Sequence, residues 1–554
     1  MVSGLQPNGT GSWAFKAGVA VANAVAWVNY TAVADGGVPG VTGFSSLSVS
    51  TNADYADVVQ MYGAGWCEGY VTAGEVWAAW QVVVGAWFPQ NFNTTELPEQ
   101  YQAYMATQDA WVRANVASNS SALWTAMGYL VAQGDGMAAG YAAAAPTHPL
   151  PVYAFPVLSN QADLGDVAEA YPLPPSAAAA AGYRARARLH DAPSPAAFMR
   201  RVHGATHCSA LIKVAPDLSD LWMGHSTWSN YINMLRTYKH YSFALQDGAA
   251  VGRDVSFSSY PGCLSSTDDW LNVWSSGLTV IETTNIVYNE SLYAAVVPQS
   301  LWSWQRVRVA SLLAPNPPAW AALFGQYNSG TYNNGYQVVH VGAFVPGAGL
   351  PADFIWEVEQ VPGLVVGGDV TVQLAYGYFP SYNVPFWPSI YTISGYPTAL
   401  ADYGVAAPMT GVHYQLAPRA QIFRRNQTAA VDLASFVALM RYNDYLHDPL
   451  SGGDPWNAVC ARGDLAAGDD AYYSGCYDTK ATSASAWAAR TAAIINGPTT
   501  SSGLPPFSWD AFPGVPHNGQ PTLFNYSVAL EAPSFVAPSS SSRLHGATAL
   551  RRQH

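Results

Sequence analysis

Charged residues are scarce in this chain, and acidic residues outnumber basic ones. Lys, Arg, Asp and Glu make up 11% of the 554 residues, and the formal net charge is −13. Nucleic-acid binding needs clustered Lys and Arg to neutralise phosphates, so this composition argues against nucleic acid as the main partner. Half of the residues are apolar and 13% are aromatic, which is enough to bury a large core.

Long apolar runs are also missing. No stretch reaches the 18 or so apolar residues of a membrane-spanning helix, so we expect no transmembrane anchor. The opening "MVSGLQPNGTGS" lacks the charged region and apolar core of a signal peptide. Yet Asn-x-Ser/Thr sequons recur, and Lys is rare. We therefore expect a secreted, lysosomal or vacuolar glycoprotein whose signal peptide is not part of this sequence. Besides Asn8, the sequons are Asn29, Asn93, Asn119, Asn289, Asn426 and Asn525.

Several motifs of metal and lipase chemistry are absent. There is no CxxC or HExxH pattern, so we expect neither a metal site nor a cofactor. The stretch "GHSTW" lacks the second glycine of G-x-S-x-G, which argues against an ordinary serine lipase. The five cysteines leave at least one thiol outside any disulfide. Cys460 and Cys476 flank a polar loop and are the predicted disulfide, with two separate thiols as the alternative.

The first part of the chain mixes strand and helix patterns. Alternation with Gly and Pro punctuation predicts hairpin strands over residues 12–50. Helical periodicity follows over residues 54–88, where we expect two helices divided near Gly69. It returns over residues 97–142, whose expected core positions are Trp111, Leu123, Met127 and Leu130.

The remainder predicts a layered α+β fold. Pro, Ala and Arg dominate residues 171–195, which is typical of a solvated linker. Short β-type runs follow, with helical segments around residues 296–313 and 430–446. We therefore divide the chain into three parts. Residues 1–170 form an N-terminal part, and residues 171–207 form a linker or pro-segment that is cut or removed on maturation. Residues 208–554 form a C-terminal part with a disordered tail from about residue 535.

Cys208 stands where this linker meets the first β-type run, "SALIKV". A cysteine is nucleophilic only as a thiolate and needs a base. His225 is one candidate, and an inert buried thiol is the alternative. If the bond between His207 and Cys208 is cut, the new α-amine of Cys208, with an ordinary pKa of about 7.7–8.0, becomes a base beside its own thiol. Nearby backbone N–H groups would then serve an oxyanion.

From Cys208 onward the sequence resembles the phospholipase B-like (lamina ancestor) family. The resemblance is carried by "CSALIKV", "GHSTWSNYINMLR", "SYPGCLSSTDDW", "YNSGTYNNGYQVV", "LAPRAQIFRR" and "SGCYDTK", and it extends to about residue 532. It implies an N-terminal nucleophile hydrolase fold, a four-layer αββα sandwich of two stacked antiparallel sheets. It also implies self-cleavage before Cys208, with Cys208 as the nucleophile and the two chains staying associated.

The resemblance also indicates further site residues. His225 and Trp228 lie in "GHSTW", where His225 would assist cleavage or orient substrate, with a structural hydrogen bond as its alternative. Asn328 is similar to the oxyanion asparagine of cysteine-type amidases, with a turn role as its alternative. Asn285 and Arg306 are further polar candidates.

The predicted activity is deacylation of lipids through an acyl-enzyme on the Cys208 thiolate. The alternatives are an amidase acting on N-acyl amides, or a catalytically silent glycoprotein that binds lipid or a partner, because fold likeness does not choose the substrate. The expected protein partners are the cleaved N-terminal chain and, in a homodimer, a second copy.

Overall fold

The structure, a computed structural model, describes residues 2–8, 12–18, 21, 23–33, 39–173, 208–265, 270–403 and 412–536. Most of the predicted linker, including His207, lies outside the described residues, and so does most of the predicted tail. The domain boundaries drawn there stay predictions.

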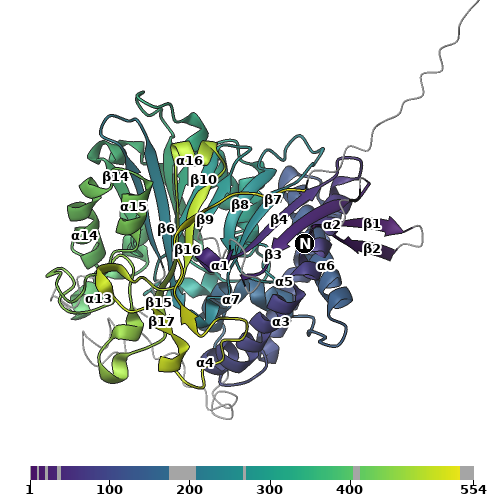
Figure 1. The fold of residues 1–554 in the computed structure, drawn as a ribbon, viewed down its shortest axis with the longest axis horizontal. Coiled ribbons are helices and arrows are strands. Elements are labelled where there is room, and N and C mark those ends of the chain that lie inside the picture. Colours follow the sequence, from purple (N-terminus) through teal and green to yellow (C-terminus); the bar gives the residue numbers. More distant parts are fainter. Residues whose placement is uncertain are drawn as a thin grey trace, which may run out of the picture.

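Two β-sheets form the centre of the molecule (Figure 1). The larger has the strand order β13-β12-β11-β10-β9-β8-β7-β4-β3-β1-β2, and the smaller has the order β14-β5-β6-β15-β16-β19. The larger sheet consists of β1 (Val2–Asn8), β2 (Ser12–Ala17), β3 (Ala26–Thr31), β4 (Ser45–Thr51), β7 (Thr237–Ser242), β8 (Asp254–Ser259), β9 (Trp270–Val273), β10 (Leu278–Thr284), β11 (Asn334–Val339), β12 (Ile355–Val361) and β13 (Leu364–Asp369). The smaller consists of β5 (Ser209–Val214), β6 (Leu221–Asn230), β14 (Tyr378–Ser381), β15 (Ser474–Ser483), β16 (Ala492–Asn496) and β19 (Ala529–Glu531). A separate pair is formed by β17 (Phe507–Ser508) and β18 (Leu523–Phe524).

Within the described ranges, the paired strands are antiparallel with one exception. Strands β4 and β7 run parallel, with Ser45 opposite Thr237 and Ser50 opposite Ser242. The expectation of purely antiparallel sheets is therefore wrong at this pair. A parallel pair needs a long crossover connection, and here the chain passes through several helices and two strands of the other sheet between β4 and β7. This pair joins the strands before the linker to those after it.

Helices cover the outer sides of the two sheets. One apolar cluster packs α2, α6 and α10 on the larger sheet, a second packs α14 and α15 on the smaller, and a third lies between the sheets. Figure 1 shows these two helical groups at opposite sides of the strands. The protein is thus an α+β sandwich of two stacked sheets. Its helices are α1 (Pro39–Thr42), α2 (Asp57–Val71), α3 (Ala73–Val82), α4 (Phe88–Phe92), α5 (Glu99–Ser118), α6 (Ala122–Ala144), α7 (Ala154–Ala170), α10 (Ser303–Leu313), α11 (Pro317–Phe324), α12 (Pro388–Ile393), α13 (Tyr396–Tyr403), α14 (Pro418–Asn426), α15 (Leu433–Met440) and α16 (Ala484–Ala488), with a π-helical turn, η2, at Val83–Trp87.

Glycines bring α2 and α6 into close contact. A β-carbon added at Gly69 would lie 2.0 Å from the carbonyl oxygen of Met137, and one at Gly140 would lie 2.0 Å from that of Trp66. The predicted division of the first helical region into two helices is confirmed, with the break close to Gly69, at Thr72. The helix continues through Gly69 to Val71 and breaks at Thr72, because this glycine provides close packing and not a turn.

The other helical predictions hold with shorter bounds. Residues 97–142 form α5 and α6, where Leu123, Met127 and Leu130 are buried and Trp111 is partly buried. The helix expected from residue 296 begins only at Ser303. In the region expected to be helical from residue 430, Asp432 accepts a hydrogen bond from the Ser435 N–H and starts α15 at Leu433. Among the described residues, no helix is both long and apolar enough to span a membrane.

Candidate functional site

Cys208 lies directly before β5 with a strained backbone. Its side chain is buried, at 1% exposure. Its φ angle is +88°, in a region that side-chain-bearing residues rarely adopt. Such a conformation costs about 1–3 kcal/mol and persists only where the surroundings hold it. Cys208, which follows the bond predicted to be cleaved, is therefore under backbone strain.

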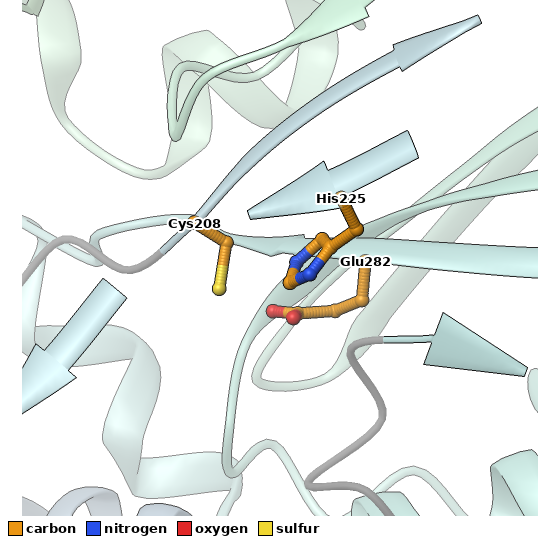
Figure 2. A group of neighbouring side chains, drawn as sticks. All are labelled: Cys208, His225 and Glu282. Atoms are coloured by element: carbon orange, nitrogen blue, oxygen red, sulfur yellow. The ribbon is translucent and has the colours of Figure 1, made fainter. Parts of the chain in front are cut away.

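His225 and Glu282 join Cys208 from two different strands. His225 lies on β6 opposite Ala210 of β5, and Glu282 lies on β10 of the larger sheet. The Cys208 sulfur, a ring nitrogen of His225 and a carboxylate oxygen of Glu282 lie within 4.8 Å of one another, and all three residues are buried. Figure 2 shows the three side chains gathered at this point. The site therefore lies where the two sheets meet.

Arg419 of α14 holds the backbone of Cys208. Its guanidinium donates to the Cys208 carbonyl at 2.7 Å and to the Ser209 hydroxyl at 3.2 Å. It also lies over the Trp228 ring, 4.3 Å from the ring centroid. Burial lowers the Arg419 pKa to about 10, and the nearby Cys208 opposes that shift. Arg419 thus supplies a buried positive charge next to the thiol, the setting that favours a thiolate.

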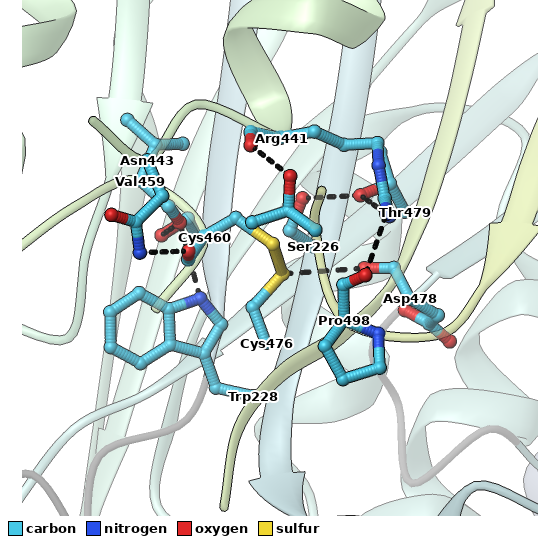
Figure 3. Close-up of a disulfide and its surroundings, with 12 residues drawn as sticks. Ser226, Trp228, Arg441, Asn443, Val459, Cys460, Cys476, Asp478, Thr479 and Pro498 are labelled. Atoms are coloured by element: carbon cyan, nitrogen blue, oxygen red, sulfur yellow. Dashed lines mark hydrogen bonds between the residues drawn. A yellow bond between two sulfur atoms is a disulfide. The ribbon is translucent and has the colours of Figure 1, made fainter. Parts of the chain in front are cut away.

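Trp228 links the site to the disulfide. Its indole N–H donates to the Val459 carbonyl at 3.2 Å, and the Ser209 hydroxyl donates to the same carbonyl at 2.8 Å. Cys460 and Cys476 form the predicted disulfide, with their Cα atoms 4.9 Å apart. Figure 3 shows Trp228 beside this bridge. The disulfide therefore fixes the loop that supports both Trp228 and the start of β5.

A buried lysine contacts His225 from β15. The Lys480 ammonium lies 2.9 Å from His225 Nδ1, 2.5 Å from the Thr227 hydroxyl and 2.7 Å from an Asp478 oxygen. Asp478 also pairs with Arg236 at 3.0 Å. The chemistry of the Cys208, His225 and Glu282 donors suits a borderline metal such as Zn²⁺. An ammonium directed at the imidazole opposes a bound cation, so these residues fit a metal poorly.

The remaining predicted catalytic residues lie in other surroundings. Asn328 donates to the Val361 carbonyl at 3.0 Å and accepts from the Gly330 N–H at 2.9 Å, which is the alternative turn role. Arg306 of α10 donates to the carbonyls of Leu301 and Phe324 and to two side chains. Neither residue is part of the Cys208 group, so their catalytic roles stay predictions without geometric support.

Asn285 follows the strand that carries Glu282. It is buried, its backbone N–H donates to the Asn333 carbonyl at 2.8 Å, and its side chain stabilises the ionised form of Glu359. Its contacts therefore connect it to a pair of buried carboxyls on β12. A role at the thiol stays a prediction.

The sequons differ in accessibility. Asn93, Asn119 and Asn525 are exposed, as an acceptor asparagine must be. The others are partly buried: Asn29, Asn289 and Asn426. Glycosylation stays a prediction at all six positions.

A groove of about 490 Å³ lies away from this chemistry. It is formed by α11, β12 and β13, with Ala321, Trp356 and Val365 among its lining residues. None of its lining residues belongs to the Cys208 group. Its position on the helix-covered side of the larger sheet gives it no contact with the thiol.

Three site residues escaped the sequence analysis: Glu282, Arg419 and Lys480. Glu282 had a local signal, since it is the one charge in the strand "LTVIETT". Lys480 had a similar signal, because Asp478 and Lys480 alternate in a fully buried strand. Arg419 had none, since nothing in "LAPRAQIFRR" distinguishes it from Arg424 and Arg425.

Comparisons with known proteins identify the family. The family model described as Phospholipase B matches residues 39–530. "Phospholipase B-like 1" of Homo sapiens is 38% identical over 477 residues, covering 85% of this chain and 81% of that protein. The protein of the same name from Rattus norvegicus is 37% identical over 477 residues, covering 85% and 82%. "Phospholipase B" of Crotalus adamanteus is 35% identical over 499 residues, covering 89% and 86%. This chain therefore belongs to the phospholipase B family.

Proposed function

We propose that this protein is a self-processing lipid hydrolase with an N-terminal nucleophile fold, in which Cys208 becomes the first residue of the mature chain and attacks acyl esters. The single observation that carries the proposal is the position of Cys208. It stands at the start of a central strand, under backbone strain, next to His225 and Glu282. The order of helix, sheet, sheet and helix layers supports the fold assignment.

Maturation begins when the Cys208 thiol attacks the carbonyl carbon of His207. A thioester forms, the peptide C–N bond breaks, and the thiol proton goes to the nitrogen, which becomes the α-amine of Cys208. Water then hydrolyses the thioester, which leaves a carboxylate on His207 and restores the thiol. Relief of the strain at Cys208 favours the first step.

The mature site would use the same atoms on a lipid ester. The α-amine takes the thiol proton, and the sulfur attacks the ester carbonyl to form a tetrahedral intermediate. The alcohol leaves with that proton, and the acyl group remains on sulfur. Water activated by the amine releases the fatty acid and restores the thiol. Arg419 supports this chemistry by holding Cys208 and by its positive charge.

The disulfide supports the proposed compartment. Disulfides form and persist in oxidising environments such as the secretory pathway and the extracellular space. Exposed sequons are consistent with that route. We therefore propose that the protein follows the secretory pathway, that its substrates are lipid acyl chains, and that its own N-terminal chain is its permanent partner.

Hydrolysis of lipids with matched substrates tests the proposal. The purified wild type, Cys208→Ala and Cys208→Ser are incubated with a diacyl phosphatidylcholine in mixed micelles and with an N-acyl amide of the same chain length. We expect the wild type to release fatty acid from the ester and to carry a transient acyl group on the peptide that starts at Cys208. Cleavage of the amide alone would favour the amidase. Equal release by wild type and Cys208→Ala would contradict the nucleophile assignment, and no release by either would favour the binding protein.

A further inference from the structure

Lys480 is held in place by a network that the sulfur chemistry does not use. Its ammonium contacts His225 Nδ1, the Thr227 hydroxyl and Asp478 Oδ1 at 2.9, 2.5 and 2.7 Å. Lys480, His225 and Asp478 are 0% exposed. Strand register brings them together, because Lys480 of β15 lies opposite His225 of β6, and Asp478 lies opposite Thr227. The long lysine side chain therefore has one defined position.

Lys480 belongs to a buried network of ion pairs. Asp478 forms ion pairs with Lys480 at 2.7 Å and with Arg236 at 3.0 Å. The Arg236 guanidinium also lies over the Tyr260 ring, 4.0 Å from the centroid. Asp478 further accepts the Thr227 N–H at 3.2 Å. A carboxylate shared in this way offsets the cost of burying an ammonium.

An ammonium has hydrogens to donate and no lone pair to accept with. The 2.9 Å contact therefore makes His225 Nδ1 the acceptor. A neutral imidazole carries one N–H, so the hydrogen must then be on Nε2.

We infer that Lys480 is a positioning residue that fixes His225 as the Nε2–H tautomer, so that His225 donates a hydrogen bond in the thiol site and does not act as its general base. The catalytic role that this inference gives to His225 rests on the proposed function. A donor at this place stabilises negative charge, either on the Cys208 sulfur or on the oxygen of a tetrahedral intermediate. The base for the thiol is then the α-amine of Cys208.

The tautomer is measured by NMR on the full-length protein with ¹⁵N-labelled histidine rings. The signals of His225 are identified by their loss in His225→Gln. We expect a bare Nδ1 and a protonated Nε2 in the wild type. In Lys480→Met, which leaves Asp478 paired with Arg236, we expect the hydrogen to distribute over both nitrogens. Lys480→Arg keeps a cationic donor and is expected to restore the wild-type pattern.

Activity provides the second readout. We expect Lys480→Met to slow self-cleavage and ester hydrolysis by about 10- to 100-fold, because a misoriented donor loses transition-state stabilisation. Lys480→Arg is expected to recover part of this loss. A protonated Nδ1 in the wild type, or an unchanged His225 spectrum in Lys480→Met, would overturn the inference. The expected spectra in a wild type that hydrolyses no ester would support the tautomer assignment and reject the proposed function instead.

Discussion

Three cysteines of this chain lie outside the disulfide, and their surroundings differ. Burial raises the pKa of Cys67 far above its usual range and that of Cys263 to about 12, so both thiols stay protonated and inert. Cys208 is also buried, but Arg419 and His225 are next to it. At the residue scale, all three thiols are buried, and Cys208 is the one whose sulfur lies beside His225 and Glu282.

Substitution of Arg419 tests whether this side chain stabilises the backbone at Cys208. In a Cys208→Ala background, chosen to prevent the proposed self-cleavage, we expect Arg419→Met to lower the free energy of unfolding by about 1.5–3 kcal/mol, the contribution of a charge-assisted hydrogen bond. Urea denaturation followed by tryptophan fluorescence measures the change. Arg424→Met on the same helix is the control, because Arg424 is exposed and surface substitutions usually change stability by about 0.5 kcal/mol or less. Equal effects of the two substitutions would contradict the assignment.

At the scale of elements, the sequence predicted long, periodic segments better than their ends. Residues 97–142 and the β-type runs after Cys208 follow local periodicity, and the structure forms helices and strands there. The break between α2 and α3 is predicted only approximately, near Gly69, because the packing role of Gly69 depends on α6, which lies far along the chain. Glu282, Arg419 and Lys480 join this site through sheet stacking, helix packing and strand register, respectively. Local sequence patterns do not encode those contacts.

The glycine contact between α2 and α6 gives a prediction with an internal control. We expect Gly69→Ala to destabilise the protein by about 1–3 kcal/mol, because the new methyl group would overlap the Met137 backbone and force the helices apart. Gly74 of α3 has no atom within 4 Å of an added β-carbon. Gly74→Ala is expected to raise stability by about 0.5–1 kcal/mol through helix propensity. Thermal unfolding of both variants checks the pair, and a Gly69→Ala variant as stable as the wild type would contradict this packing.

The disulfide leads to a second prediction at the scale of structural elements. Cys460 and Cys476 are 16 residues apart, and closing a loop of that size contributes about 3 kcal/mol in the chain-entropy model. We expect the double variant Cys460→Ala/Cys476→Ala to lose about that much stability. We also expect slower self-cleavage, since the bridged loop carries the Val459 carbonyl that binds Ser209 and Trp228. Denaturation and gel assays measure the two effects. A variant that unfolds and cleaves like the wild type would show that the bridge supports neither.

For the whole molecule, the site depends on the stacking of two sheets that come from distant parts of the chain. The parallel pair of β4 and β7 unites the parts before and after the linker in one sheet. Cys208 and His225 come from the other sheet, and Glu282 completes the group across the interface. Cleavage before Cys208 would therefore leave both parts held together by the sandwich itself.

Buried carboxyls make the stability of the sandwich depend on pH. Glu357 and Glu359 on β12 are buried, and burial raises the pKa of Glu359 to about 8 and that of Glu357 well above its usual range. Because the folded state favours the protonated forms, their contribution is most favourable at acidic pH. It is lost progressively as the pH rises from about 4.5, the unfolded value, through about 8.

Glu357→Gln isolates this effect. We expect the variant to gain stability relative to the wild type as the pH rises from 5 to 8, since the amide removes the cost of ionising a buried carboxyl and the repulsion between the two carboxylates. Urea denaturation at several pH values gives the difference. A constant difference between the two proteins over this range would contradict the raised pKa values.

The central claim is that Cys208 becomes the start of a chain. Expression of the wild type and Cys208→Ala with a secretory signal, followed by denaturing gels and N-terminal sequencing, tests it most directly. We predict two wild-type fragments of about 22 and 37 kDa before glycans, by share of chain length, with the larger beginning at Cys208. Cys208→Ala is predicted to stay whole. A wild type that remains one chain, or a Cys208→Ala variant cut at the same bond, would contradict the account.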